Sequence, residues 1–382
     1  MTGATEGRPP GTVVLAVDSF KGSIAADAAA DALEAGWHHV RPGDRIVHRP
    51  MADGGEGTVA AFAAAVPGAT LMPVTVDGPE GAPVEAHWLL LPPTADADAD
   101  AGTGVVELAG TSGIELLGTP PRLRPLDADT RGFGQAIAAA LDHGVSRLVL
   151  GIGSSASTDA GVGMLAALGA RVLDVDGAPV APGARGLGDV VEVDLSGLAP
   201  LPAGGVRVLS DVTHPLTGPR GAAAVFGPQK GLGGDDIPAV DAALARLADL
   251  VGVDPDAPGS GAAGGTGFAL RLWGGELVPG AEEVAELIGL ADAIGGAAVV
   301  VTGEGAFDGQ SAAGKVPSRV HHLAAVAGVP AMLVAGRISP EADTSAFAAT
   351  ASLTDLAGTP EAAMADPATW LAQAGAALAA SL

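Results

Sequence analysis

The run Thr12-Val-Val-Leu-Ala-Val17 is short and apolar, and the polar loop Asp18-Ser-Phe-Lys-Gly-Ser23 follows it directly. A run of this kind, bounded by a loop and then by a segment of helical composition, is typical of a strand buried in a parallel sheet. We therefore predict a strand at 12–17 and a helix over 24–35, with Ser23 as its N-cap. The pattern returns with a strand at 45–50 and a helix at 58–65, so the chain opens as βαβα.

The pattern changes further along the chain and then returns. Strand-like segments at 70–76, 84–91 and 104–108 have no helix between them, whereas buried strands separated by a helix reappear at 297–301 and 331–334. The simplest α/β architecture is a doubly wound, Rossmann-like domain formed by both chain ends, 1–75 plus 290–382. A second α/β domain, 76–289, is predicted to be inserted between them.

Composition excludes several classes of partner. The 382 residues carry a formal net charge of -25, which repels nucleic acid and anionic lipid. The chain has no cysteine, so disulfides, thiolate catalysis and cysteine-ligated zinc are excluded. Residues 1–10 lack the apolar stretch of a signal peptide, and no segment is apolar for long enough to span a bilayer. We expect a cytoplasmic protein with no nucleic-acid or membrane partner, and its oligomeric state stays open.

The lysines have an unusual distribution. The chain has three, Lys21, Lys230 and Lys315, and each stands next to a glycine. Accident is one explanation, because the chain is rich in glycine. The explanation we favour is that a compact point charge in a glycine loop meets a phosphate or carboxylate.

Carboxylates gather in the loops that leave the predicted strands. Because ligands of open parallel sheets bind at the carboxyl ends of the strands, these loops form the candidate site. Phosphoryl transfer needs such a set: lysines neutralise the phosphoryl charge, and carboxylates hold Mg²⁺ or accept the hydroxyl proton. The alternative for each single Asp is that it caps a loop or a helix. The carboxylates concerned are Asp18, Asp53, Glu56, Asp211, Glu304 and Asp308.

Common fingerprints do not fit. The segment Gly309-Gln-Ser-Ala-Ala-Gly-Lys-Val316 has the spacing of a Walker A loop, but Val316 stands where Ser or Thr would bind Mg²⁺. The serines of 154–157 lack the sequence of a nucleophile elbow.

Taken together, the loops resemble the glycerate kinase family of bacterial glyoxylate and sugar-acid pathways. The stretches Pro50-Met-Ala-Asp-Gly-Gly-Glu-Gly-Thr58 and Ala222-Ala-Ala-Val-Phe-Gly-Pro-Gln-Lys-Gly231 carry the likeness most specifically. They are joined in family order by 18–23, by Asp211-Val-Thr-His-Pro-Leu-Thr-Gly218, and by Gly303-Glu-Gly-Ala-Phe-Asp-Gly-Gln310 with Gly314-Lys315. The resemblance implies ATP-dependent phosphorylation of D-glycerate, with Mg²⁺ as cofactor and 2-phosphoglycerate as the favoured product.

The resemblance also brings these loops into one hypothesis about the site. We assign Lys21, Asp53, Asp211 and Lys230 to catalysis, with Asp211 as the base, and Asp53 and Asp308 to the metal. Substrate and phosphate binding is assigned to Asp18, Ser19, Gly54, Gly55, Glu56, Asp159, His214, Glu304, Gly309 and Lys315.

Two segments depart from the family pattern. His214 stands where the family usually has Asn, and 154–161 reads Ser-Ser-Ala-Ser-Thr-Asp-Ala-Gly where the family is richer in glycine. These departures leave two alternatives open: a kinase of another small hydroxy acid or polyol, and a non-catalytic sensor of a hydroxy acid or nucleotide.

Overall fold

The computed structural model describes residues 9–93, 101–308 and 315–382. The chain forms two compact units. The first comprises Met1–Asp53, Ala60–Pro67 and Ala281–Leu382, and the second comprises Gly54–Val59 and Gly68–Gly280. These boundaries differ from the predicted ones at three segments. Residues 54–59 and 68–75 were predicted in the first domain but belong to the second unit, and residues 281–289 were predicted in the second domain but belong to the first unit.

The first unit is built on a five-stranded sheet in which every strand is parallel to its neighbours. Its order is β13-β12-β11-β1-β2, so the chain runs outward in one direction from β1 and in the other from β11. Counted within the unit this is the order 2-1-3-4-5, one of the two common doubly wound orders. The strands are β1 (Thr12–Val17), β2 (Arg45–His48), β11 (Val299–Phe307), β12 (Ala331–Ile338) and β13 (Thr350–Ser352).

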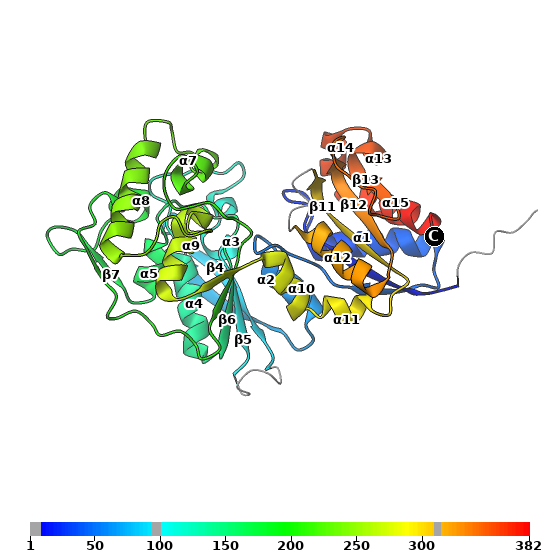
Figure 1. The fold of residues 1–382 in the computed structure, drawn as a ribbon, viewed down its shortest axis with the longest axis horizontal. Coiled ribbons are helices and arrows are strands. Elements are labelled where there is room, and N and C mark those ends of the chain that lie inside the picture. The colour runs from blue at the N-terminus through cyan, green and yellow to red at the C-terminus, as the bar shows by residue number, and fades with distance from the viewer. Residues whose placement is uncertain (1–8, 94–100, 309–314) are drawn as a thin grey trace, which may run out of the picture. The chain divides into compact units, whose positions relative to one another are not determined.

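Helices cover both faces of this sheet. The β1–β2 and β11–β12 crossovers run in opposite directions, so their right-handed connections place α1 and α12 on opposite faces. Helices α1 and α15 lie side by side, and Leu33, Trp37 and Leu371 pack with Val13 and Leu15 of β1 in one core (Figure 1). The helices are α1 (Ala26–Val40), α2 (Thr58–Ala65, whose first two residues belong to the second unit), α10 (Gly280–Leu287), α11 (Leu290–Ile294), α12 (Val316–Ala327), α13 (Leu353–Ala357), α14 (Pro360–Ala365) and α15 (Pro367–Ala380).

The second unit is built on a six-stranded mixed sheet of order β10-β9-β6-β5-β4-β3. Its strands are β3 (Thr70–Asp77), β4 (Pro83–Leu91), β5 (Thr103–Glu107), β6 (Arg147–Gly151), β9 (Val206–Leu209) and β10 (Glu276–Val278), beside a hairpin of β7 (Arg171–Leu173) and β8 (Glu192–Asp194). Strands β5, β6, β9 and β10 are parallel, so their carboxyl ends share one edge.

Helices of the second unit form two cores. Phe133 and Ile137 of α4 pack on the sheet with α5 and α9, and Leu244 of α8 forms a separate core with α7 and Phe268 of α9 (Figure 1). The helices are α3 (Ala109–Ser112), η1 (Ile114–Leu117), α4 (Arg131–His143), α5 (Val162–Ala167), α6 (Gly183–Leu187), α7 (Ala222–Phe226), η2 (Pro228–Lys230), α8 (Ile237–Val251) and α9 (Ala262–Trp273). Throughout the described part of the chain, every helix is too short or too polar to cross a membrane.

Several bounds differ from those expected, among them the end of β12, which runs past Val334 to Ile338, and two of the differences concern the loops of the candidate site. Ser23 does not cap α1, because it lies in a turn closed by the bridge between Phe20 and Ile24, and the helix begins at Ala26. The strand predicted at 297–301 runs on to Phe307, so Glu304 lies inside β11 and not in a loop. The backbone pairing of Glu304 with Ala335 and of Phe307 with Ile338 extends the strand through its glycines.

Candidate functional site

A cavity of about 430 Å³ opens in the first unit where its strand order reverses. This point, between β1 and β11, is where doubly wound sheets bind ligands. The loop that leaves β1 supplies Asp18, Ser19 and Lys21, and the carboxyl-terminal half of β11 supplies Glu304. Asp53, in the loop between β2 and α2, completes the polar wall. These five residues and Lys315, all predicted from sequence, therefore line one cavity.

The cavity holds three carboxylates, Asp18, Asp53 and Glu304, and the positive charge of Lys21 partly neutralises them. Lys21 Nζ lies 3.2 Å from Asp53 Oδ2. Desolvation opposes the charging of Lys21, but attraction to Asp53 and Asp18 outweighs it and raises the pKa of the ammonium group. Burial, followed by repulsion from Asp53, raises the pKa of the Asp18 carboxyl to about 7. Glu304 adds to that repulsion. Closely spaced carboxylates of this kind favour a cation beside them.

The remaining walls combine two further cations with an apolar end. Lys315 lies at the N-cap position of α12, and Arg337 lies near the carboxyl end of β12. A helix N-terminus and two cationic side chains suit an anionic ligand. The apolar end of the cavity is lined by Leu353, Pro360, Ala363 and Met364.

The glycine-rich segment 54–58 packs against the strand ends of the second unit. A Cβ on Gly54, whose φ is +94°, would come within 2.5 Å of the Leu209 carbonyl oxygen. A Cβ on Gly153 would come within 2.4 Å of Gly55 Cα. Gly153 N–H also donates to the Gly54 carbonyl at 3.0 Å. Gly54 and Gly153 are thus required by close backbone packing, whatever part Gly54 takes in binding.

Lys230 is the charged centre of the second unit. It is 3 % exposed, and its ammonium donates to Ser155 Oγ at 2.6 Å and to the Ser157 carbonyl. Among the residues that the structure describes, no carboxylate lies within ion-pair distance of Lys230. Desolvation lowers the pKa of Lys230 to about 7, which the more distant Asp159 only partly opposes.

Asp159 organises the loop beside Lys230. Its Oδ2 accepts from Thr130 N, Thr130 Oγ1 and Gly163 N at 2.8–3.2 Å. Its Oδ1 accepts from Ser157 Oγ at 3.0 Å and Gly161 N at 3.1 Å. With five donors satisfied on a fully buried carboxylate, Asp159 supports the loop and does not face solvent.

The backbone around these two residues is strained. Ser154, Ala160 and Ala263 have φ of 60°, 52° and 52°, and they are the non-glycine residues with positive φ in the described chain. Ala160 N–H donates to the Gly264 carbonyl at 3.1 Å, which joins the two strained loops. Sparsely populated backbone conformations cluster at functional sites, so this cluster is a second candidate region.

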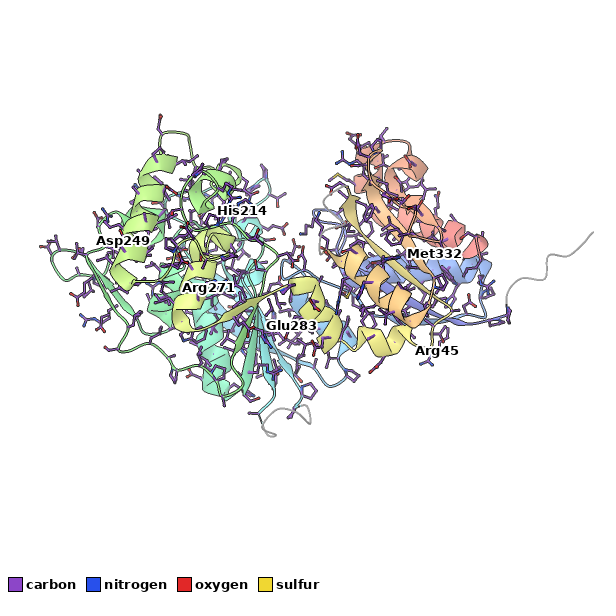
Figure 2. The ribbon with its side chains drawn as sticks, in the orientation of Figure 1. Arg45, His214, Asp249, Arg271, Glu283 and Met332 are labelled. Atoms are coloured by element: carbon purple, nitrogen blue, oxygen red, sulfur yellow. The ribbon has the colours of Figure 1, made fainter. Side chains whose placement is uncertain are left out.

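The other predicted residues are more scattered. Asp211 is exposed after β9, and its Oδ1 accepts from Gly280 N at 3.1 Å. His214, labelled in Figure 2, lies on the loop between β9 and α7, where Nδ1 contacts the Arg220 carbonyl and the ring packs edge-on against Phe226. Asp308 follows β11 directly. Gly309 lies outside the described residues.

Sequence reasoning missed Glu107. It is the last residue of β5, is 9 % exposed, and lines a cavity of about 220 Å³ in the second unit with Glu56, Glu115 and Ser154. Burial raises the pKa of its carboxyl to about 6. The rule that identified Asp18, a carboxylate at the carboxyl end of a predicted strand, would have found Glu107 as well. Arg337 was missed as well, although it follows the predicted strand 331–334 by three residues and so lies where ligand-binding loops are expected.

Comparison with known proteins places the chain among glycerate kinases. A family model described as the glycerate kinase family matches residues 13–382. A glycerate kinase of Bacillus subtilis (strain 168) is 40% identical over 338 residues, covering 87% of this chain and 86% of that protein. A glycerate 2-kinase of Escherichia coli (strain K12) is 40% identical over 336 residues, covering 86% of each. A crystal structure from Salmonella typhimurium LT2, of a protein assigned as glycerate kinase 2, superposes with a TM-score of 0.81 at 37% identity, covering 97% of this chain and 98% of that one.

Proposed function

The chain belongs to the glycerate kinase family, and we propose that it transfers the γ-phosphoryl group of ATP to the 2-hydroxyl of D-glycerate, giving 2-phosphoglycerate. The name of the Escherichia coli relative, glycerate 2-kinase, supports this choice of hydroxyl. In this reaction the bond from the γ-phosphorus to the β,γ-bridging oxygen breaks. A bond from the same phosphorus to the glycerate oxygen forms, and the hydroxyl proton leaves to a base. We place the reaction in the cytoplasm, where ATP is available.

The cavity of the first unit is the proposed ATP site. The observation that carries the proposal is the meeting of Lys21, Lys315 and Arg337 at the β1/β11 switch point. These cations neutralise phosphate oxygens, and the N-terminus of α12 adds backbone donors of the same polarity. The apolar end formed by 353–364 is suited to the nucleobase, since ligand pockets pair apolar walls with a few polar groups.

Mg²⁺ fits the carboxylates of this cavity. Asp18, Asp53 and Glu304 supply oxygen ligands of the kind that Mg²⁺ prefers, and a divalent cation would relieve the repulsion that contributes to the raised pKa of Asp18. We propose Asp53 as the principal ligand, with Asp308 at the end of β11 as a second candidate. When bound, the ion supplies positive charge to the phosphate oxygens.

The second unit is proposed to recognise the acceptor. Loop 154–161, held by Asp159 and Lys230, would shape the acceptor site, with His214 on the neighbouring loop. Asp211 is the proposed base, because its carboxylate is exposed at the carboxyl end of β9 and can accept a hydroxyl proton. Lys230 is too buried to act as a simple phosphate clamp, so we propose that it acts through the Ser155–Ser157 segment.

The test is ADP release by the purified protein with Mg²⁺, ATP and D-glycerate, followed by NMR of the product. Release that requires glycerate is expected, with the phosphorus resonance of the product split by the single proton on C2. Splitting by the two protons on C3 would overturn the choice of hydroxyl alone. Turnover of another hydroxy acid but not of glycerate would indicate that the altered loops around 154–161 and His214 accept a different substrate. Nucleotide binding with no ADP release for any acceptor would support a sensor.

A further inference from the structure

Helix α2 has no side-chain cap of its own. Its N-cap position is Gly57, which has no side chain, and its first turn carries no acidic residue. The first N–H groups of a helix lack partners within the helix, and a carboxylate or hydroxyl normally satisfies one of them. The partner of α2 must therefore come from elsewhere.

Glu107 supplies that partner from 48 to 50 residues away. Its Oε1 accepts from Gly57 N at 3.2 Å and its Oε2 from Val59 N at 3.0 Å. Glu107 is 9 % exposed at the carboxyl end of β5, so both bonds are partly shielded from water. A negative charge at this point also complements the helix dipole.

Other hydrogen bonds of the same segment differ from this one in what they join. Thr58 Oγ1 donates to the Gly55 carbonyl at 2.8 Å, which only closes the turn on itself. The Gly153 N–H bond to the Gly54 carbonyl ties the segment to the loop after β6, and the glycines merely permit that approach. Glu107 ties the other end of the segment, at Gly57 and Val59, to a strand of the second unit's sheet.

We propose that Glu107 is a positioning residue, which caps α2 from strand β5 and thereby fixes the glycine-rich segment 54–58, which carries Glu56 and directly follows Asp53. Asp53 immediately precedes Gly54 and lines the cavity of the first unit beside Lys21. Glu56 lines the same small cavity of the second unit as Glu107. The expected loss of kcat rests on the proposed phosphoryl transfer. The expected increase in hydrogen exchange at the start of α2 does not depend on it.

The test compares Glu107→Gln with Glu85→Gln. Gln keeps the size of Glu107 but can accept with one group only, so one of the two N–H bonds is lost. Glu85 lies in β4 of the same unit, where its carboxylate accepts from Thr75 Oγ1 at 2.8 Å on the exposed surface, and it serves as the matched control. Hydrogen exchange of the peptide covering 55–62 and steady-state kinetics are measured for both variants and the wild type.

We expect Glu107→Gln to speed exchange at 57–60 by at least about tenfold and to lower kcat by about tenfold or more, with KM for ATP within about twofold. Glu85→Gln should change neither. Unchanged exchange in Glu107→Gln overturns the capping role, and faster exchange with unchanged kcat overturns the positioning role. If the wild type shows no glycerate-dependent turnover, the proposed function fails while the exchange result still tests the cap.

Glu107→Asp covers the case in which Glu107→Gln does not fold. The shorter carboxylate keeps its charge but cannot reach both amides, so this variant should fold and show intermediate exchange and intermediate kcat. Wild-type exchange and kcat in Glu107→Asp would show that the reach of the side chain is irrelevant, which contradicts the proposal.

Discussion

The two units each hold a lysine among polar groups, and the two environments differ in kind. Lys21 is 64% exposed at its side chain and pairs with Asp53 in an open cavity, whereas Lys230 is 3 % exposed and is bound by a serine hydroxyl and a backbone carbonyl. The carboxylates raise the pKa of Lys21, and burial lowers that of Lys230 to about 7. The first environment suits recognition of a charged ligand. The second suits the fixing of a strained loop.

The largest expected difference between the two regions is in the free energy of unfolding of two variants, one at Asp159 and one at Asp53. Asp159→Asn should lower the free energy of unfolding by about 3 kcal/mol, because an amide nitrogen would face N–H donors that now have an acceptor. Asp53→Asn should change it by less than about 1 kcal/mol, because Asp53 pairs with a largely exposed lysine. Urea unfolding of both variants measures this. Equal destabilisation would remove the distinction between a supporting and an open carboxylate.

The next effect is on activity. Lys21→Ala should reduce kcat/KM by about 10²-fold or more, because a cation that meets the transferred phosphoryl group is lost. Arg45→Ala is the control, since Arg45 is an exposed cation on β2 of the same unit and is absent from the lining of the cavity (Figure 2). Near-normal kcat/KM in Lys21→Ala would exclude Lys21 from the reaction.

A smaller effect should appear in the pH dependence of stability. The unfolded chain binds the Lys230 proton up to a pKa near 10.5, whereas the folded chain releases it near 7. The unfolded state therefore binds more protons between these values, so Lys230 makes stability rise with pH there, by up to about 1.4 kcal/mol per pH unit. Lys230→Met should abolish that part of the slope in urea unfolding at pH 7, 8 and 9. An unchanged slope would show that Lys230 is not desolvated as described.

The smallest effect is that of the exposed ion pair on stability. The Lys21–Asp53 pair should contribute less than about 1 kcal/mol, and its contribution should fall as salt is raised. A double-mutant cycle of Lys21→Ala and Asp53→Ala at low and high salt measures the coupling. A coupling well above this value that salt does not screen would place the pair in a more buried setting than the structure shows.

Regular elements with strong local patterns were predictable from sequence. The strand at 12–17 and the helix at 58–65 occur with the expected bounds. The extension of β11 was not predictable, because its glycines break the apolar pattern and the pairing partner in β12 lies some 30 residues away. Helix α9 was missed because it opens with three residues of positive φ, Ala263, Gly264 and Gly265, that no helical pattern indicates.

The candidate site was predictable to the extent that strand ends determine it. We expected ligand-binding residues in the loops at the carboxyl ends of the parallel strands, and this expectation placed Asp18, Lys21 and Asp53 in one site. All three line the cavity of the first unit. Lys230 is buried against Ser155 and Ser157, which lie 75 and 73 residues away, and Thr130, 29 residues from Asp159, supplies two of the donors to that carboxylate, so no local pattern could reveal these contacts. Their roles in the reaction remain predictions.

The most direct test of the contrast between the two lysines is calorimetric binding of a non-hydrolysable ATP analogue with Mg²⁺ to the wild type, Lys21→Ala and Lys230→Met. The account predicts that Lys21→Ala weakens binding by at least about tenfold, since it removes a cation from the nucleotide cavity, and that Lys230→Met stays within about twofold of the wild type. Loss of binding in Lys230→Met with normal binding in Lys21→Ala would contradict the account, because it would move the nucleotide to the second unit.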